Sequence, residues 1–173
     1  MRKTLLLRAA TAAVVALAIT FIQAHNAFVG LIAVLAFSTG ILAAEIWEAI
    51  AGQDRQVRGT VIRIAAGSVI VSVLVGTSDL FLLTVMSMNV VFFGYAFLVI
   101  EIFRAVRVGF KSREGRDHVV VASIHFLMTA LFVCSLAGFI ELGEVPAVGF
   151  FGGYAAILAV LWGLRAFDPK QPS

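Results

Sequence analysis

The sequence predicts an all-α polytopic membrane protein with six transmembrane helices, arranged as three repeated helical hairpins in a single domain, residues 1–173. Three observations predict it: the apolar composition, six long apolar stretches, and basic residues confined to alternate connections. Hydrophobic residues make up 61% of the chain and charged residues 13%, against about 45–50% and about 25% in soluble domains. A soluble globule of this length could not bury so much apolar surface, which also excludes disorder and a large extramembrane catalytic domain.

The apolar stretches give the helices in order. A helix needs about 20 apolar residues to cross the bilayer core. The third stretch is the shortest, and the turn-forming Gly76-Thr77-Ser78-Asp79 separates it from the fourth. Met-Arg-Lys at the start resembles a signal peptide, but Arg8 interrupts the apolar run, so we expect a retained first helix. The six predicted spans are residues 5–22, 27–50, 60–75, 80–106, 119–140 and 147–166.

The charge distribution orients these spans. Connections 23–26, 77–79 and 141–146 contain no lysine or arginine, so all 13 basic residues fall on the other side of the membrane. The positive-inside rule then places both termini in the cytoplasm, with a cytoplasmic loop at 107–118. This one-sided distribution also argues against nucleic acid as a partner, despite the net charge of +3. The single cysteine, Cys134, excludes an internal disulfide.

The even-numbered spans resemble one another. Glu45-Ile-Trp-Glu-Ala-Ile50 aligns with Glu101-Ile-Phe-Arg-Ala-Val106, and Phe92-Phe-Gly-Tyr-Ala96 aligns with Phe151-Gly-Gly-Tyr-Ala155. These matches predict hairpin repeats at about 5–50, 60–106 and 119–166. All three would start and end on the same side, so the repeats are parallel, which argues against an alternating-access transporter built from inverted repeats.

The same residues resemble a known family. Phe93-Gly94-Tyr95-Ala96-Phe97-Leu98-Val99-Ile100 and the run from Phe151 to Leu158 are similar to the even helices of HdeD-like small membrane proteins of bacteria. The resemblance implies six helices as three hairpins in a bacterial inner membrane. It also implies an association with acid or envelope stress, although most members have no assigned activity.

Charges inside the spans suggest ion pairs. Each charge at membrane depth costs about 2.5–3.5 kcal/mol on insertion scales. The first two hairpins each bring one base and one acid to the same depth, whereas the third has Ala122 and Val160 at the aligned positions. Loss of both partners together is expected of a salt bridge, because removing one leaves an uncompensated charge. We therefore predict the intramembrane pairs Arg8–Glu45 and Arg63–Glu101.

Other polar residues allow two interpretations. His125 could pair with Glu101 as a proton-responsive couple, or it could be neutral and hydrogen-bonded to helix backbone or to Thr129. Asn89 is expected to form an interhelical hydrogen bond. An outer acidic rim would lose negative charge as the external pH falls, although the positive-inside rule alone would produce it. Its members are Asp79, Glu141 and Glu144.

Small residues predict close helix contacts. Ala36, Gly40 and Ala44 recur every four residues, and Gly149 and Gly153 form a GxxxG pair. They would pack helices within one chain or build a homo-oligomer. The partners predicted outside the chain are the lipid bilayer, with the basic loop 104–116 anchored at anionic lipids of the cytoplasmic face, and a larger membrane complex.

No motif of an enzyme, a metal site or a cofactor site occurs in the sequence. We therefore predict a non-enzymatic inner-membrane protein with no cofactor and no metal. Two alternatives remain open at this point. The chain could be an accessory subunit of a larger complex, or a small transporter or channel, for which Asn89, Thr129 and His125 offer few lumen-lining polar groups.

Overall fold

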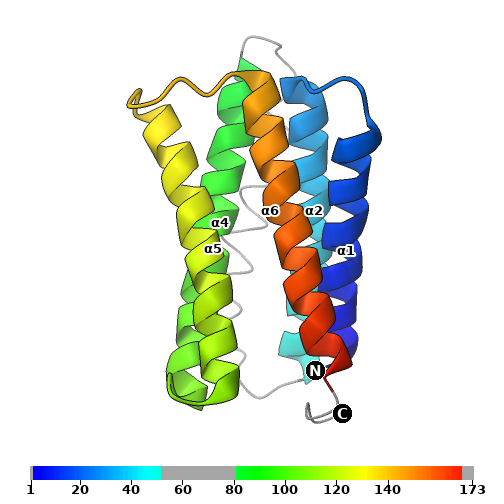
Figure 1. Cartoon of the computed structure of the whole chain (residues 1–173), viewed down its shortest axis with the longest axis vertical. Coiled ribbons are helices and arrows are strands. Elements are labelled where there is room, and N and C mark those ends of the chain that lie inside the picture. Colours follow the sequence, from blue (N-terminus) through cyan, green and yellow to red (C-terminus); the bar gives the residue numbers. More distant parts are fainter. Residues whose placement is uncertain (1, 52–80, 169–173) are drawn as a thin grey trace.

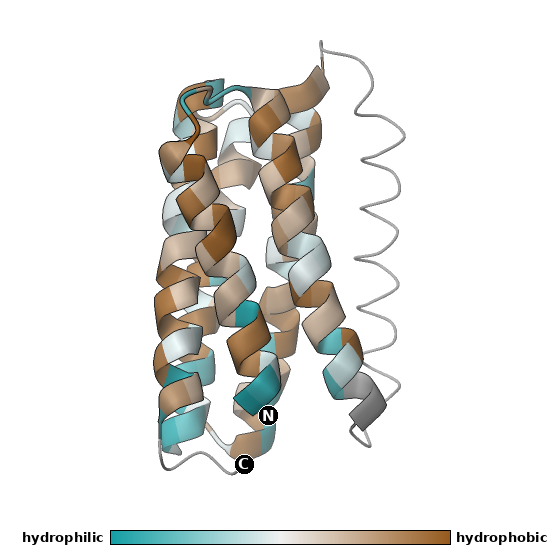
Figure 2. Cartoon of the chain, turned by 90° about the vertical axis from the view of Figure 1, so that its right-hand side faces the viewer, coloured by the Kyte–Doolittle hydropathy of each residue, from teal (hydrophilic) through white to brown (hydrophobic). Residues whose placement is uncertain are grey.

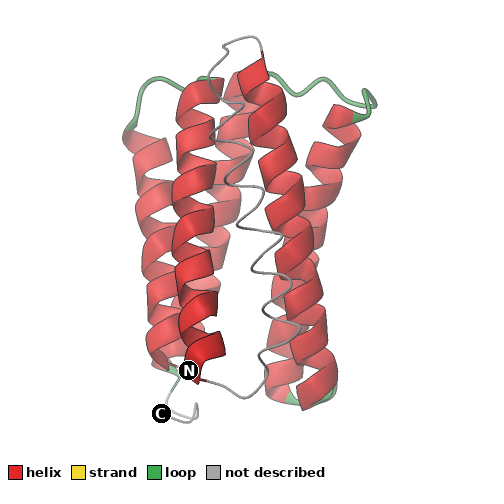
Figure 3. Cartoon of the chain, turned by 180° about the vertical axis from the view of Figure 1, so that it is seen from behind, coloured by secondary structure: helices red, strands yellow, loops and turns green. Residues whose placement is uncertain are grey.

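The computed structural model describes residues 2–51 and 81–168, and in this part the chain is entirely helical, with loops between the helices (Figures 1 and 3). The prediction of an all-α multi-pass membrane protein is confirmed to that extent, because all five described helices are long and apolar enough to cross a membrane. The span predicted at 60–75 lies outside the described residues. The helices are α1 Arg2–Phe21, α2 Ala27–Ala51, α4 Leu82–Val108, α5 Arg113–Leu136 and α6 Glu144–Phe167.

The start of α5 differs most from the prediction. The helix begins at Arg113 rather than at residue 119, so the expected loop 107–118 is wrong and only 109–112 separate α4 from α5. Ser112 caps the helix, with its hydroxyl oxygen accepting a hydrogen bond of 2.9 Å from the Gly115 amide. Glu114 in the first turn also interacts favourably with the helix dipole. The hydropathy pattern marked only the apolar part of this helix.

The helices form a bundle in which α1 begins and α6 ends at the same end, here called the terminal end (Figure 1). The α1–α2 and α5–α6 connections lie at the opposite end. Helix α4 packs along α5 and α1 packs along α6, while α2 contacts α1, α4 and α6. Contact between α5 and α6 is sparse, although they follow each other in the chain.

Residues that the sequence repeat aligns on α4 and α6 differ in burial. Tyr154 on α6 is buried, whereas its counterpart Tyr95 on α4 is exposed. Likewise Trp162 is buried and Phe103 is exposed. The two helices therefore turn corresponding faces in different directions, α6 toward the core and α4 away from it.

The bundle is apolar both inside and on its sides. Phe37, Phe132 and Phe151 are almost fully buried in the core. Large apolar side chains such as Leu127 and Leu164 point outward, and hydrophilic residues gather toward the terminal end (Figure 2). An apolar exterior is what a lipid environment requires, and in lipid the helices associate through close packing and polar contacts.

The predicted packing residues divide into two groups. A side chain at Gly40 would place its Cβ 2.3 Å from Thr11 Cγ2, so α1 approaches α2 closely at this glycine. Ala44 is also buried. Ala36, Gly149 and Gly153 are exposed instead, and a Cβ at either of these glycines would meet nothing within 4 Å.

We expect Gly40→Leu to destabilise the bundle by about 1–3 kcal/mol, because the β-branched Thr11 cannot easily move aside. Gly163→Leu is the matched control: it also replaces a helical glycine, but nothing lies within 4 Å of its Cβ. Thermal unfolding of the detergent-solubilised protein should show a lower midpoint for Gly40→Leu alone. Equal midpoints for the two variants would contradict the close α1–α2 contact.

Candidate functional site

Charged and polar side chains from all five described helices meet inside the bundle near its terminal end. We call this set the ion cluster. Its carboxylates and basic groups are largely buried; Glu45, for example, has 2% of its side chain exposed. The cluster consists of Arg8 from α1, Glu45 and Glu48 from α2, Glu101 and Arg104 from α4, His118 from α5 and Arg165 from α6.

The two glutamates of α2 bind two arginines. Glu45 and Glu48 are three residues apart and therefore lie on one face of the helix. Arg8 Nη2 lies 2.6 Å from Glu45 Oε1 and 2.5 Å from Glu48 Oε2. Arg104 Nη2 lies 3.0 Å from Glu45 Oε2 and 2.8 Å from Glu48 Oε2. The predicted partners Arg8 and Glu45 are thus in contact, and each also binds a further charge.

Arg104 joins this pair of helices to α4 and α5. Its Nη1 lies 2.5 Å from Glu101 Oε1, and the other oxygen of Glu101 lies 2.5 Å from His118 Nδ1. The suggestion that the whole loop 104–116 anchors at lipid headgroups is therefore wrong for Arg104, which is buried among carboxylates. Arg63 lies outside the described residues, so its pairing with Glu101 stays a prediction.

His118 links three helices. Its Nδ1 lies 2.5 Å from Glu101 Oε2 of α4. Its Nε2 lies 3.3 Å from Arg165 Nη2 of α6 and 3.8 Å from Glu114 Oε1 of its own helix. The imidazole therefore joins α5 to both α4 and α6.

The cluster contains as many arginines as glutamates. Arg8, Arg104 and Arg165 stand against the carboxylates of Glu45, Glu48 and Glu101. Removing charges from water costs several kcal/mol per ion unless each finds a partner in good geometry. The contacts within the cluster supply those partners. The charged groups therefore face one another inside the bundle and do not line an open surface.

His125 contacts a residue that neither interpretation of the sequence indicated. Its Nδ1 is 2.7 Å from the Tyr154 hydroxyl, and its ring packs among aromatic side chains such as Phe97, with 5.7 Å between centroids. The histidine that contacts Glu101 is His118. Hydropathy alone could not show this, because it assigned His118 to a loop, whereas the Ser112 cap places that residue in helix α5.

Two further polar predictions have clear outcomes. Asn89 donates from Nδ2 to the Val85 carbonyl of its own helix at 2.7 Å, and among the described residues it forms no hydrogen bond to another helix. Of the predicted outer acidic rim, Glu144 accepts a hydrogen bond of 2.9 Å from the Ala27 amide, which ties α6 to the start of α2. Glu141 is exposed, and Asp79 lies outside the described residues.

Within residues 2–51 and 81–168, no group of three or more histidine, cysteine, aspartate or glutamate side chains could hold a metal ion. The chain matches no protein-family model, no curated protein and no solved structure. The resemblance to HdeD-like proteins therefore rests on the sequence pattern alone.

We expect Arg104→Met to destabilise the protein by about 3–5 kcal/mol, because it leaves carboxylates of Glu45, Glu48 and Glu101 buried without this partner. Unfolding in detergent at neutral pH should show this loss. Arg116→Met is the control, because Arg116 is exposed and its guanidinium contacts a backbone carbonyl. An Arg104→Met protein as stable as Arg116→Met would refute a stabilising role for the cluster.

Proposed function

We propose that the chain is a non-enzymatic, multi-pass protein of the bacterial cell membrane that acts in acid or envelope stress, as HdeD-like proteins are associated with doing. In this proposal the ion cluster keeps the helices assembled when the membrane or its surroundings are perturbed. The observation that carries it is the burial of the cluster across five helices.

The geometry supports a structural role for these charges. The side chains of Glu45, Glu101 and His118 are at most 5% exposed, and each is bonded to another member of the cluster. Such groups are not presented to a solute, as those of an active site or a hydrated channel would be. In lipid there is little hydrophobic force between helices, so charge-assisted contacts of this kind contribute much of the cohesion.

The proposal includes six helices in three hairpins, with both termini in the cytoplasm. Two features support it. Helix α2 ends at the terminal end, while α4 begins at the opposite end, the placement expected of helices on either side of a further span (Figure 1). The described lysines and arginines lie toward the terminal end, the distribution expected of a cytoplasmic side.

A complementation assay tests this function. A strain that lacks the gene should survive strong acid or membrane-perturbing detergent at least tenfold less well than its parent. Plasmid copies of the wild type and of Arg116→Met should restore survival, whereas Arg104→Met should not, because it disrupts the ion cluster.

Each copy carries a C-terminal fluorescent protein that matures only in the cytoplasm, so fluorescence reports both the amount of protein and the orientation. Variants are compared at equal fluorescence. Equal survival of the deletion strain and its parent under both stresses would overturn the proposed function, and a non-fluorescent wild-type fusion in the membrane fraction would overturn the orientation.

A further inference from the structure

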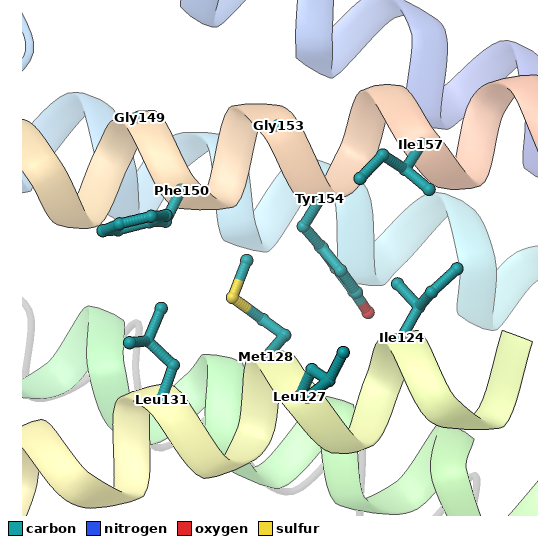
Figure 4. A pocket seen from close by; sticks show the side chains of 9 residues that line it. All are labelled: Ile124, Leu127, Met128, Leu131, Gly149, Phe150, Gly153, Tyr154 and Ile157. Carbon is teal, nitrogen blue, oxygen red and sulfur yellow. The ribbon is translucent and has the colours of Figure 1, made fainter.

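The sparse contact between α5 and α6 leaves a seam along the bundle that contains two grooves. The groove at the terminal end measures about 230 Å³ and carries four charged residues, Arg113 and Asp117 of α5 with Arg165 and Asp168 of α6. The second groove measures about 320 Å³ and is almost entirely apolar (Figure 4). Val121 lines the first and Ile124 the second, one helical turn apart, so the grooves follow each other along the same seam.

Arg165, which lines the charged groove, has a hydrogen-bond donor without an acceptor among the described residues. Arg165 has 10% of its side chain exposed, and its Nε is buried with no hydrogen-bond partner among the described residues. The nearest carboxylate, Asp117 Oδ2, is 4.0 Å away, which is too long for a hydrogen bond. A buried N–H of this kind favours a ligand that supplies an oxygen acceptor, and phosphate, like carboxylate, is an acceptor that guanidinium groups bind in two-pronged geometry.

The charges around this donor identify the ligand more closely. Arg113 is well exposed and pairs with Asp168, with 2.8 Å between Nη2 and Oδ2, while Asp117 is partly exposed beside Arg165. Two arginines and two aspartates thus line the groove. This alternation complements a headgroup that carries both a phosphate and an ammonium group, rather than one that is only anionic.

The apolar groove continues from the charged one into the depth of the bundle. Gly149 and Gly153 lack side chains there, and a Cβ at either position would meet nothing within 4 Å. Ile124, Met128 and Leu131 of α5 face them across the seam (Figure 4). A charged groove followed by an apolar groove along membrane-spanning helices matches the headgroup and acyl chain of a phospholipid.

We propose that the α5–α6 seam binds one phospholipid with a phosphoethanolamine headgroup, from the leaflet at the terminal end. Its phosphate accepts from Arg165 Nε and Arg113, its ammonium lies by Asp117, and one acyl chain fills the groove beside Gly149 and Gly153. A transmembrane helix from another protein or from a second copy would fill the apolar groove but would leave the Arg165 donor unsatisfied, so we favour the lipid. This site does not depend on the proposed role in stress.

Native mass spectrometry of the full chain tests the proposal. The protein is delivered from vesicles that contain phosphatidylethanolamine and phosphatidylglycerol in equal amounts, and the retained lipid is identified. We expect the wild type to carry one phosphatidylethanolamine, with at least a tenfold preference over phosphatidylglycerol, and excess inorganic phosphate should not displace it.

Two variants separate the parts of the site. Gly153 lines the apolar groove and a Cβ there meets nothing within 4 Å, so Gly153→Leu should occupy the groove and reduce retention about tenfold. Gly163→Leu, on the same helix but outside the groove, should retain lipid as the wild type does. Asp117→Asn removes the partner of the ammonium and should abolish the preference for phosphatidylethanolamine. Circular dichroism establishes that each variant is folded before the comparison.

Three results would overturn the proposal. They are a lipid-free wild type, equal retention by folded Gly153→Leu and Gly163→Leu, and a second protein chain cross-linked through the seam in place of lipid. Equal retention of the two lipids by the wild type would overturn the assignment of the headgroup.

Discussion

The cost of burying charge near a membrane boundary is the constraint on which this structure depends. Each of the five described helices contributes a charged or hydrogen-bonding group to the ion cluster, and no member could remain buried without the others. Arg104 is its centre, because it contacts Glu45 and Glu48 of α2 and Glu101 of its own helix. The cluster thereby fixes how each helix is rotated about its axis and how far it is shifted along that axis. Apolar packing alone would specify both less strictly.

The seam between α5 and α6 follows from the same arrangement. Helix α5 packs along α4 and α6 packs along α1, while at the terminal end α5 and α6 meet through Arg113–Asp168 and through His118–Arg165. Farther along, the exposed Gly149 and Gly153 leave room between them. Polar contacts therefore hold the two helices at one end, and the space beyond is available to a ligand with an apolar chain.

Much of the fold could be predicted from the sequence, but only part of the site. Long apolar runs located the five described helices, although α5 begins six residues before its apolar run. The match in depth of Arg8 and Glu45 indicated their contact. The rotation of a helix about its axis is not encoded in hydropathy, so pairing of His125 with Glu101 stayed open as one of two interpretations, and neither of them indicated its contact with Tyr154. The importance of His118 was missed because the residue lies in a segment taken for a loop, and that of Arg104 because it was assigned to lipid headgroups at the end of its predicted span. The i, i+3 spacing of Glu101 and Arg104, and the Ser112 cap, were the available signals.

The coupling between Arg8 and Glu45 is the most direct measure of whether the cluster holds the bundle together. A double-mutant cycle with Arg8→Met, Glu45→Met and the double variant gives this coupling from free energies of unfolding in one detergent. The structure predicts a double variant that is more stable than the sum of the single losses implies, with a coupling of about 0.5–3 kcal/mol. Strictly additive losses would contradict the account, because the two side chains would then contribute independently of each other.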